Sequence, residues 1–190
     1  RRMRADWSDL PSQWQSALND FSSHLRFERN RSEHTVRAYL GDIVSVARHA
    51  QSVGASTLAD VSLETLRSWM MDMVDQAAAR RTMARRVAAV RTFFAWAQRS
   101  GLIDVDVSLR LSTPKIPSTL PEVLTADQAT ALMELATIAA DDGSAVALRD
   151  VAMVELLYST GMRVSELVGI DIDDIDMSSR TVRVLGKGSK

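Results

Sequence analysis

The sequence predicts a mainly α-helical chain of two domains, with a small β-hairpin towards its C-terminal end. Apolar residues recur at spacings of three and four over most of residues 1–111 and again over residues 124–159. Three of the four prolines lie within residues 112–121, where no helical pattern is present. Residues 181–185 form a short β-branched and apolar run, which is typical of a strand.

The composition is that of an ordinary soluble globular protein, with 46% apolar and 25% charged residues. No apolar run approaches the length of a membrane span, and residues 1–7 lack the apolar segment of a secretory signal. The absence of cysteine excludes disulfides, thiolate metal sites and cysteine nucleophiles, and is compatible with a reducing cytoplasm. We therefore expect a cytoplasmic protein without membrane association.

The two parts of the chain carry opposite charge. Residues 1–111 contain 16 Arg, no Lys and 12 acidic residues, an excess of four positive charges. Residues 112–190 contain 7 basic and 12 acidic residues, an excess of five negative charges, so the chain as a whole has a net charge of only −1. This asymmetry indicates that the first part is the one suited to binding a polyanion.

Four helices are predicted in the first domain, residues 1–111. The first ends at Asn30-Arg31, Ser32 caps the second, Ser62 caps the third, and the fourth covers about residues 78–99. Their inward faces are Trp14, Leu18, Phe21 and Leu25; Val36, Tyr39, Leu40, Ile43 and Ala47; Leu63, Leu66, Met70 and Met73; and Met83, Val87, Val90, Phe94 and Ala97. The second helix carries small and polar residues on its opposite face, namely His34, Ala38, Gly41, Ser45 and Arg48.

The fourth helix combines its apolar face with an arginine-rich one. Opposite the apolar stripe lie Arg81, Arg85, Ala88, Thr92 and Arg99, and Arg80, Arg86 and Arg91 lie on the flanks. Such a face is most often simply solvated. Here, however, almost no acidic residue in the helix can pair with the arginines, and small residues between them allow close approach to a groove. Arginine binds phosphate and guanine in a bidentate manner, so duplex DNA is the natural partner.

The second domain is predicted to begin after the linker, residues 112–121, and to cover residues 122–190. Gly101 ends the preceding helix, and Thr125 with Gln128 forms a capping box for a helix that extends to about Ala139. Another helix follows from about Val146 to Ser159.

Arg163 is predicted to lie in the first turn of a helix that follows Gly161, where the helix dipole favours an anion rather than a cation. An arginine there is explained if it holds an anion together with the helix end. Glu166 is close enough to orient it. The simpler alternative is a surface ion pair between residues three apart, worth about 0.3 kcal/mol.

The segment Gly186-Lys187-Gly188 does not fit the phosphate-binding loop of nucleotide-binding proteins. That pattern requires a glycine five residues before its final Gly-Lys, where this sequence has Thr181 or Ser179, and it also requires a helix after the loop. A tight turn with Lys187 at its tip is the better interpretation, and an ordinary solvated lysine remains the alternative.

Taken together, these segments resemble the tyrosine recombinase (phage integrase) family, most closely its bacterial Xer branch, over nearly the whole chain. Residues 35–39 (TVRAY), 85–87 and 91–94 resemble its N-terminal core-binding domain, a SAM-like helical bundle. Residues 120–125 resemble the linker and the entry to its α+β catalytic domain. The most specific match is residues 157–167 (LYSTGMRVSEL) followed by residues 182–188 (VRVLGKG).

The resemblance implies roles for three residues of the second domain. Arg163 would grip a non-bridging oxygen of the scissile phosphate, Glu166 would be its acidic neighbour, and Lys187 would protonate the leaving 5′ oxygen. Fixed cations stabilise the charge that a phosphoryl transition state develops, and the leaving alkoxide needs a general acid. The family forms a 3′-phosphotyrosyl link and needs no metal ion or other cofactor.

The resemblance also implies partners. These are a duplex recombination site and paired or identical recombinase subunits that form a tetramer, and a DNA translocase is a further candidate. Chromosome dimer resolution is the expected role. The candidate DNA contacts lie on the second and fourth helices: His34, Thr35, Arg37, Arg81, Arg85, Arg86 and Arg91.

Several family features have no counterpart in this sequence. The second catalytic arginine, the histidines and the tyrosine nucleophile of the family follow the hairpin lysine, whereas the sequence ends at Lys190. Tyr39 and Tyr158 are predicted to be core residues. We therefore expect the chain to bind DNA without cutting it. Two alternatives are a non-catalytic DNA-binding module and a helical protein-interaction module, and a phage or transposon role is not distinguished from that of Xer.

Overall fold

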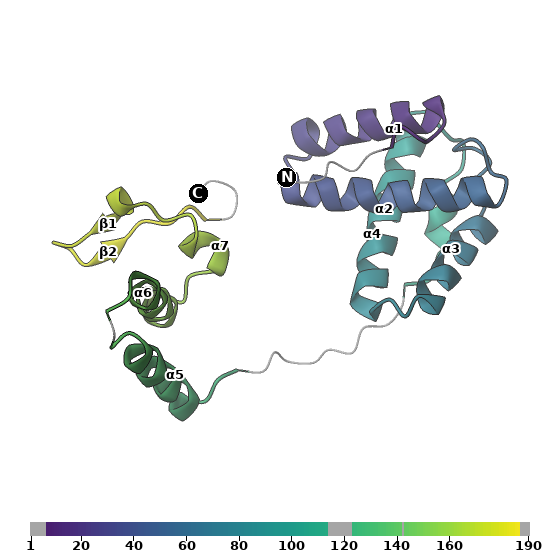
Figure 1. Cartoon of the computed structure of the whole chain (residues 1–190). Helices are drawn as coiled ribbons and strands as arrows, with labels where there is room; N and C mark the ends of the chain where they lie inside the picture. Colours follow the sequence, from purple (N-terminus) through teal and green to yellow (C-terminus); the bar gives the residue numbers. More distant parts are fainter. Residues whose placement is uncertain (1–6, 114–122, 142, 187–190) are drawn as a thin grey trace. The chain divides into compact units, whose positions relative to one another are not determined.

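The computed structural model describes residues 7–113, 123–141 and 143–186, which are mainly helical (Figure 1). The chain divides into two compact units, Arg1–Ser118 and Thr119–Lys190. No helix in the described parts of the chain combines the length and the apolarity needed to span a membrane.

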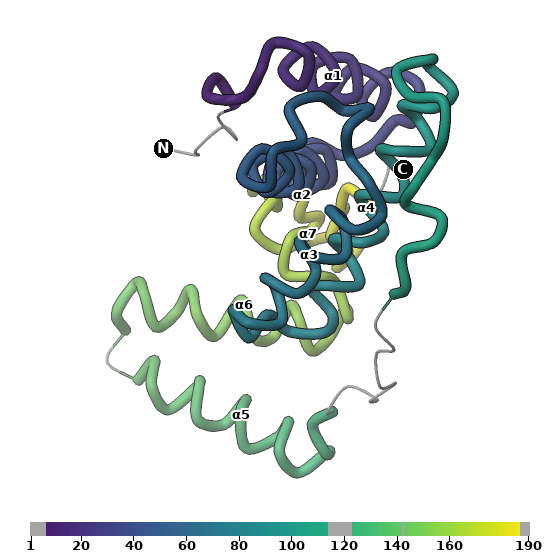
Figure 2. The backbone as a smooth tube through the Cα atoms, turned by 90° about the vertical axis from the view of Figure 1, so that its right-hand side faces the viewer, coloured from purple at the N-terminus to yellow at the C-terminus, as the bar shows by residue number. Residues whose placement is uncertain are grey.

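The first unit is a helical bundle. Its elements are α1 (Ser12–Ser23), the π-helical turn η1 (His24–Glu28), α2 (Glu33–Ser52), α3 (Leu63–Asp75), α4 (Arg80–Arg99) and the 3-10 turn η2 (Val107–Arg110). In Figure 1, α4 crosses α2, against which it packs, and Figure 2 shows α2 nearly end-on.

The predicted helix boundaries of this unit are confirmed. The side chain of Ser32 accepts a hydrogen bond from the backbone N–H of Thr35 at 3.3 Å, and Ser62 forms a capping box with Thr65. Asn30 and Gly101 have φ values of 46° and 71°, so both chain reversals use the left-handed conformation that ends a helix.

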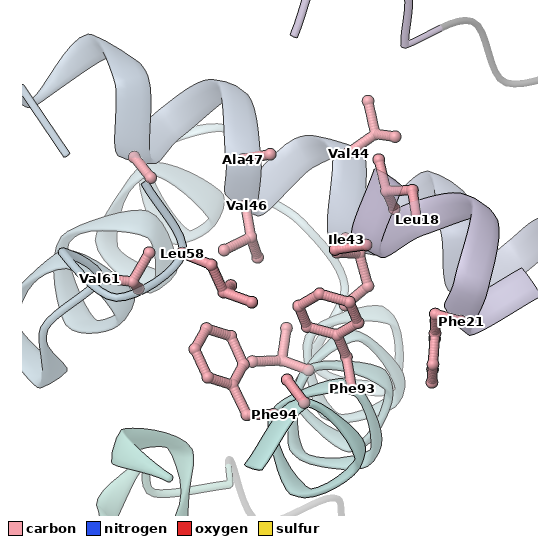
Figure 3. Close-up of a cluster of buried hydrophobic side chains, with 14 of the residues drawn as sticks. Leu18, Phe21, Ile43, Val44, Val46, Ala47, Leu58, Val61, Phe93 and Phe94 are labelled. Atoms are coloured by element: carbon pink, nitrogen blue, oxygen red, sulfur yellow. The ribbon is translucent and has the colours of Figure 1, made fainter. Parts of the chain in front are cut away.

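The core of the first unit is built from the predicted apolar faces (Figure 3). Trp14, Leu18, Phe21 and Leu25 of the N-terminal helical segment are all buried, as are the five residues of the predicted α4 stripe. Phe93 lies outside the predicted apolar stripe but is fully buried, and it contacts Phe21 edge to face at a centroid distance of 5.1 Å. The apolar face of α4 is therefore wider than a single stripe, and the polar face is correspondingly narrower.

The second unit contains α5 (Ala126–Ala139), α6 (Ala145–Thr160), the short α7 (Val164–Leu167), η3 (Ile172–Asp174), β1 (Ile175–Asp176) and β2 (Thr181–Val182). Thr125 and Gln128 form the predicted capping box of α5. Gly161 ends α6 with a φ of 64°, which lets the chain turn directly into the Arg163 segment.

The prediction that Tyr158 is a core residue is wrong. Its side chain is 65% exposed, and among the described hydrophobic residues of this unit only Ala129 and Leu167 are buried. Helical spacing predicts which face of α6 is apolar, but it does not predict whether another element covers that face. Tyr39, in contrast, is partly buried against the core of the first unit.

The hairpin in the described residues lies earlier in the chain than the one predicted from the sequence. β1 and β2 pair antiparallel, with Ile175 opposite Val182, so the observed turn precedes the predicted strand. Asp176 stabilises this turn by accepting hydrogen bonds from the backbone of Ser178 and Ser179, and these bonds together with those from the serine hydroxyls lower the pKa of Asp176. The predicted turn at Lys187 and residues 114–121 of the predicted linker lie outside the described residues.

Candidate functional site

The candidate DNA contacts of the first unit lie on two helices that pack together. His34, Thr35 and Arg37 belong to the first turns of α2, where His34 and Arg37 are exposed and Thr35 is partly exposed. The four arginines belong to α4, which packs against α2. The helix start is held by an ion pair between Arg26 and Glu33, whose Nε and Oε1 atoms are 2.7 Å apart.

Arg85 and Arg86 share one carboxylate, that of Asp42 in α2. The guanidinium group of Arg85 donates to both oxygens of Asp42, with Nη2 3.0 Å from Oδ1. The Nε atom of Arg86 lies 3.6 Å from Oδ1. The Asp42 side chain is only 5% exposed, whereas that of Arg85 is 44% exposed, so the pair extends from the helix interface to the surface.

The electrostatics of Asp42 reflect two opposing effects. Burial raises the pKa of its carboxyl group, because the charged form loses hydration, while the two guanidinium groups act in the opposite direction. Asp42 was not predicted as a partner of these arginines, because it belongs to the second helix and not to the fourth. A signal was present, because Asp42 is an acidic residue that directly follows Gly41 and precedes the inward-facing Ile43.

Arg91 has a different position from the one predicted. Its guanidinium group donates a hydrogen bond to the backbone carbonyl of the buried Leu111, and its Nε atom is buried. The partly buried Arg91 thus ties α4 to the segment after η2. Helical spacing placed Arg91 on the flank of the basic face, but the chain beyond α4 returns to cover that flank. Arg91 thus also has a structural role, and its contact with DNA stays a prediction.

Arg81 meets the prediction for an exposed cation on α4. It is exposed, as are Ala88 and Arg99 farther along the same face, and Thr92 is partly exposed. The hydroxyl group of Thr92 donates to the carbonyl of Ala88, four residues earlier, so its polar group is satisfied within the helix. The face therefore has the predicted combination of arginine and small residues.

Arg163 and Glu166 are brought together at the start of α7. Arg163 is the residue immediately before the helix rather than within its first turn, and its side chain is 72% exposed. The carboxylate of Glu166 accepts one hydrogen bond from the backbone N–H of Arg163 at 2.8 Å and another from its guanidinium group at 2.6 Å. These bonds lower the pKa of Glu166 and keep it ionised. Lys187 lies outside the described residues.

This arrangement orients the guanidinium group of Arg163 without occupying all of its N–H donors. Glu166 is mostly covered, and its two contacts with Arg163 leave the exposed side of the guanidinium facing solvent. An anion such as a phosphate oxygen could be bound there by charge-assisted hydrogen bonds. The DNA-contact candidates belong to the first unit and Arg163 with Glu166 to the second.

Comparisons with known proteins identify the family of the chain. Residues 18–101 match the family model described as phage integrase, N-terminal SAM-like domain, and residues 122–190 match that of the phage integrase family. A tyrosine recombinase XerC of Mycobacterium leprae is 50% identical over 173 residues, which are 91% of this chain and 58% of the relative. A tyrosine recombinase XerC of Mycobacterium tuberculosis is 49% identical over 176 residues, 93% of this chain and 59% of the relative.

The fold is also similar to a solved structure. A crystal structure of a lambda integrase (residues 75–356) dimer bound to a COC′ core site superposes with a TM-score of 0.66 and 20% identity, over 92% of this chain and 59% of that one. The chain thus spans just under three fifths of the length of the relatives it matches. Because two adjacent family models cover most of the sequence and relatives about half identical match over nine tenths of it, the chain belongs to the phage integrase (tyrosine recombinase) family.

Proposed function

We propose that this chain serves site-specific DNA recombination, with residues 1–111 as a duplex-binding domain joined by residues 112–121 to the N-terminal part of a catalytic domain, residues 122–190. The observation that carries the proposal is the arginine face of α4, a helix that packs against α2, together with the exposed His34 and Arg37 in the first turns of α2. Homology to XerC recombinases and to lambda integrase supports recombination as the process.

The DNA contacts that we propose are His34, Thr35 and Arg37 of α2 with Arg81, Arg85 and Arg86 of α4. The guanidinium group of arginine forms bidentate hydrogen bonds with phosphate oxygens and with guanine edges. The small residues between the arginines permit an approach to the major groove. Since the carboxylate of Asp42 offsets only one of the two charges of Arg85 and Arg86, this surface keeps a net positive charge.

In the second unit, Arg163 is proposed to bind a non-bridging oxygen of the scissile phosphate, oriented by Glu166. Phosphoryl transfer depends on positioned cations that offset the charge of the equatorial oxygens, and the preset contact with Glu166 reduces the cost of positioning Arg163. Lys187 is proposed as the general acid for the leaving 5′ oxygen. The nucleophile in this proposal is a tyrosine that attacks to form a 3′-phosphotyrosyl link.

The proposal extends to partners and to the cellular role. Chromosome dimer resolution in the cytoplasm is the proposed role, with paired recombinase subunits acting as a tetramer on two duplexes and a DNA translocase as a further partner. The similar proteins of two Mycobacterium species are named tyrosine recombinase XerC, which supports the recombinase part of this proposal. The structurally similar lambda integrase is described as a dimer bound to its core site, which supports an assembly on DNA.

Duplex binding at increasing salt tests the proposed function. We expect steep loss of affinity with salt, and Arg81→Ala should reduce the slope of log K against log salt by about 1, the effect of one lost phosphate contact. Arg67→Ala, which removes an exposed arginine from α3, is the matched control and should leave the slope unchanged. A wild-type chain that does not bind duplexes at low salt, or equal effects of the two substitutions, would contradict the proposal.

A further inference from the structure

The buried carboxylate of Asp42 is not required by packing. It lies between α2 and α4, where Ile43 and Val87 are fully buried and apolar contacts already hold the helices together. Replacing a buried ion pair with apolar residues of similar volume is often neutral or stabilising, so stability alone does not explain a charged group at this position.

The contacts of Asp42 indicate instead that its role is connected with the two arginines that it binds. Arg85 is bound through both of its terminal nitrogens, which fixes the plane of its guanidinium group as well as its position. The Nε atom of Arg86 is buried and has no hydrogen-bond partner within the described residues. Its electrostatic attraction to the Asp42 carboxylate, 3.6 Å away, is therefore what orients the Arg86 side chain.

Both arginines remain available to a ligand. Their side chains are 44% and 30% exposed, so both are partly accessible from solvent while each also contacts the buried carboxylate of Asp42. The single carboxylate of Asp42 contacts two guanidinium groups, so the three side chains together keep a net positive charge. This arrangement differs from an ordinary exposed salt bridge, in which both partners are mobile and the charges cancel.

We propose that Asp42 is a positioning residue of the DNA-binding surface. It holds Arg85 and Arg86 in one arrangement before DNA arrives, and thereby provides discrimination between base sequences rather than overall affinity. The inference rests on the proposed function, because it assumes that these arginines meet a duplex. A free arginine can follow any phosphate, whereas an arginine held in one plane accepts only a base edge or phosphate in the matching position.

The test compares two duplexes and four forms of the full chain. One duplex is enriched from a random pool by binding to the wild type, and the other is a scrambled duplex of the same composition. The proteins are the wild type, Asp42→Asn, Arg85→Ala and the double variant. Asp42→Asn keeps the size of the side chain and removes its charge, which releases Arg85.

We expect Asp42→Asn to lower the ratio of affinities for the enriched and scrambled duplexes by about tenfold, the size of one bidentate contact. Affinity for the scrambled duplex should not fall, because the surface gains one net positive charge. In the Arg85→Ala background, Asp42→Asn should change the ratio by less than about twofold, since little remains for the carboxylate to position.

Three results would overturn the positioning role. The first is an equal loss of affinity for both duplexes in Asp42→Asn, which indicates a structural defect. The second is an undiminished effect in the Arg85→Ala background. The third is a wild type that shows no preference between the duplexes. A wild type that binds neither duplex overturns the proposed function itself, so the two failures are distinguishable.

Discussion

The pairing of Arg85 with Asp42 has a consequence for stability. Removing one partner of a fully buried ion pair costs about 3–5 kcal/mol, because the other charge is left without compensation. Here Arg85 is 44% exposed and Arg86 remains beside the carboxylate, so both effects reduce the cost. We therefore expect Arg85→Ala to destabilise the first unit by about 2 kcal/mol.

Urea denaturation followed by tryptophan fluorescence measures this cost in the right part of the chain. All four tryptophans, Trp7, Trp14, Trp69 and Trp96, belong to the first unit, so the signal does not report on the second. With a denaturant dependence of about 2 kcal/mol per molar urea, the midpoint should fall by about 1 M at an unchanged slope.

The matched control is Arg81→Ala, one turn earlier on the same helix and exposed. It should change stability by no more than about 0.5 kcal/mol, since it removes no buried partner. Equal effects of Arg81→Ala and Arg85→Ala would refute the reasoning, because Asp42 would then not depend on Arg85. The result also shows how far a loss of DNA binding by Arg85→Ala reflects stability.

Three further outcomes are expected. Phe93→Ala should cost the first unit about 4 kcal/mol by leaving a cavity in the aromatic core, whereas Phe27→Ala, at a side chain that is 82% exposed, should cost less than about 0.5 kcal/mol in the same assay. In an NMR pH series, the carboxyl group of Glu166 should titrate with a pKa below the usual value of about 4.3. Its contact with Arg163 is then fully present above the usual pKa and is lost as the pH falls through the lowered pKa. A normal titration midpoint would contradict the capping geometry. In hydrogen exchange of this chain, the amides of α6 should exchange far faster than those of α4, because α6 has no buried residue, and equal protection would show that α6 is covered.

Local signals predicted much of the fold. The caps at Ser32, Ser62 and Thr125 each satisfy a backbone N–H of the following turn, and this chemistry depends on residues within three positions. The apolar face that contains Trp14 and Phe21 was also predictable, since helical spacing fixes it. Such features are carried by neighbouring residues and can therefore be read from the sequence.

Features that depend on distant segments were not predictable in this way. Asp42 and Arg85 are 43 positions apart, and only the crossing of α2 and α4 brings them together. Arg91 is covered because Leu111 returns to α4, and Tyr158 is exposed because no described element covers its side of α6. Sequence patterns therefore indicate candidate site residues, while tertiary contacts decide which of them are held by the interior.

We propose that the first turns of α2 and the N-terminal half of α4 form one DNA-binding surface. Titration of the isotopically labelled chain with a duplex, followed by amide and arginine side-chain NMR signals, tests it most directly. We expect the largest shifts at residues 34–37 and 80–86, with little change in α1. Shifts concentrated on α1 or α3, with the Arg81 and Arg85 signals unchanged, would contradict the account.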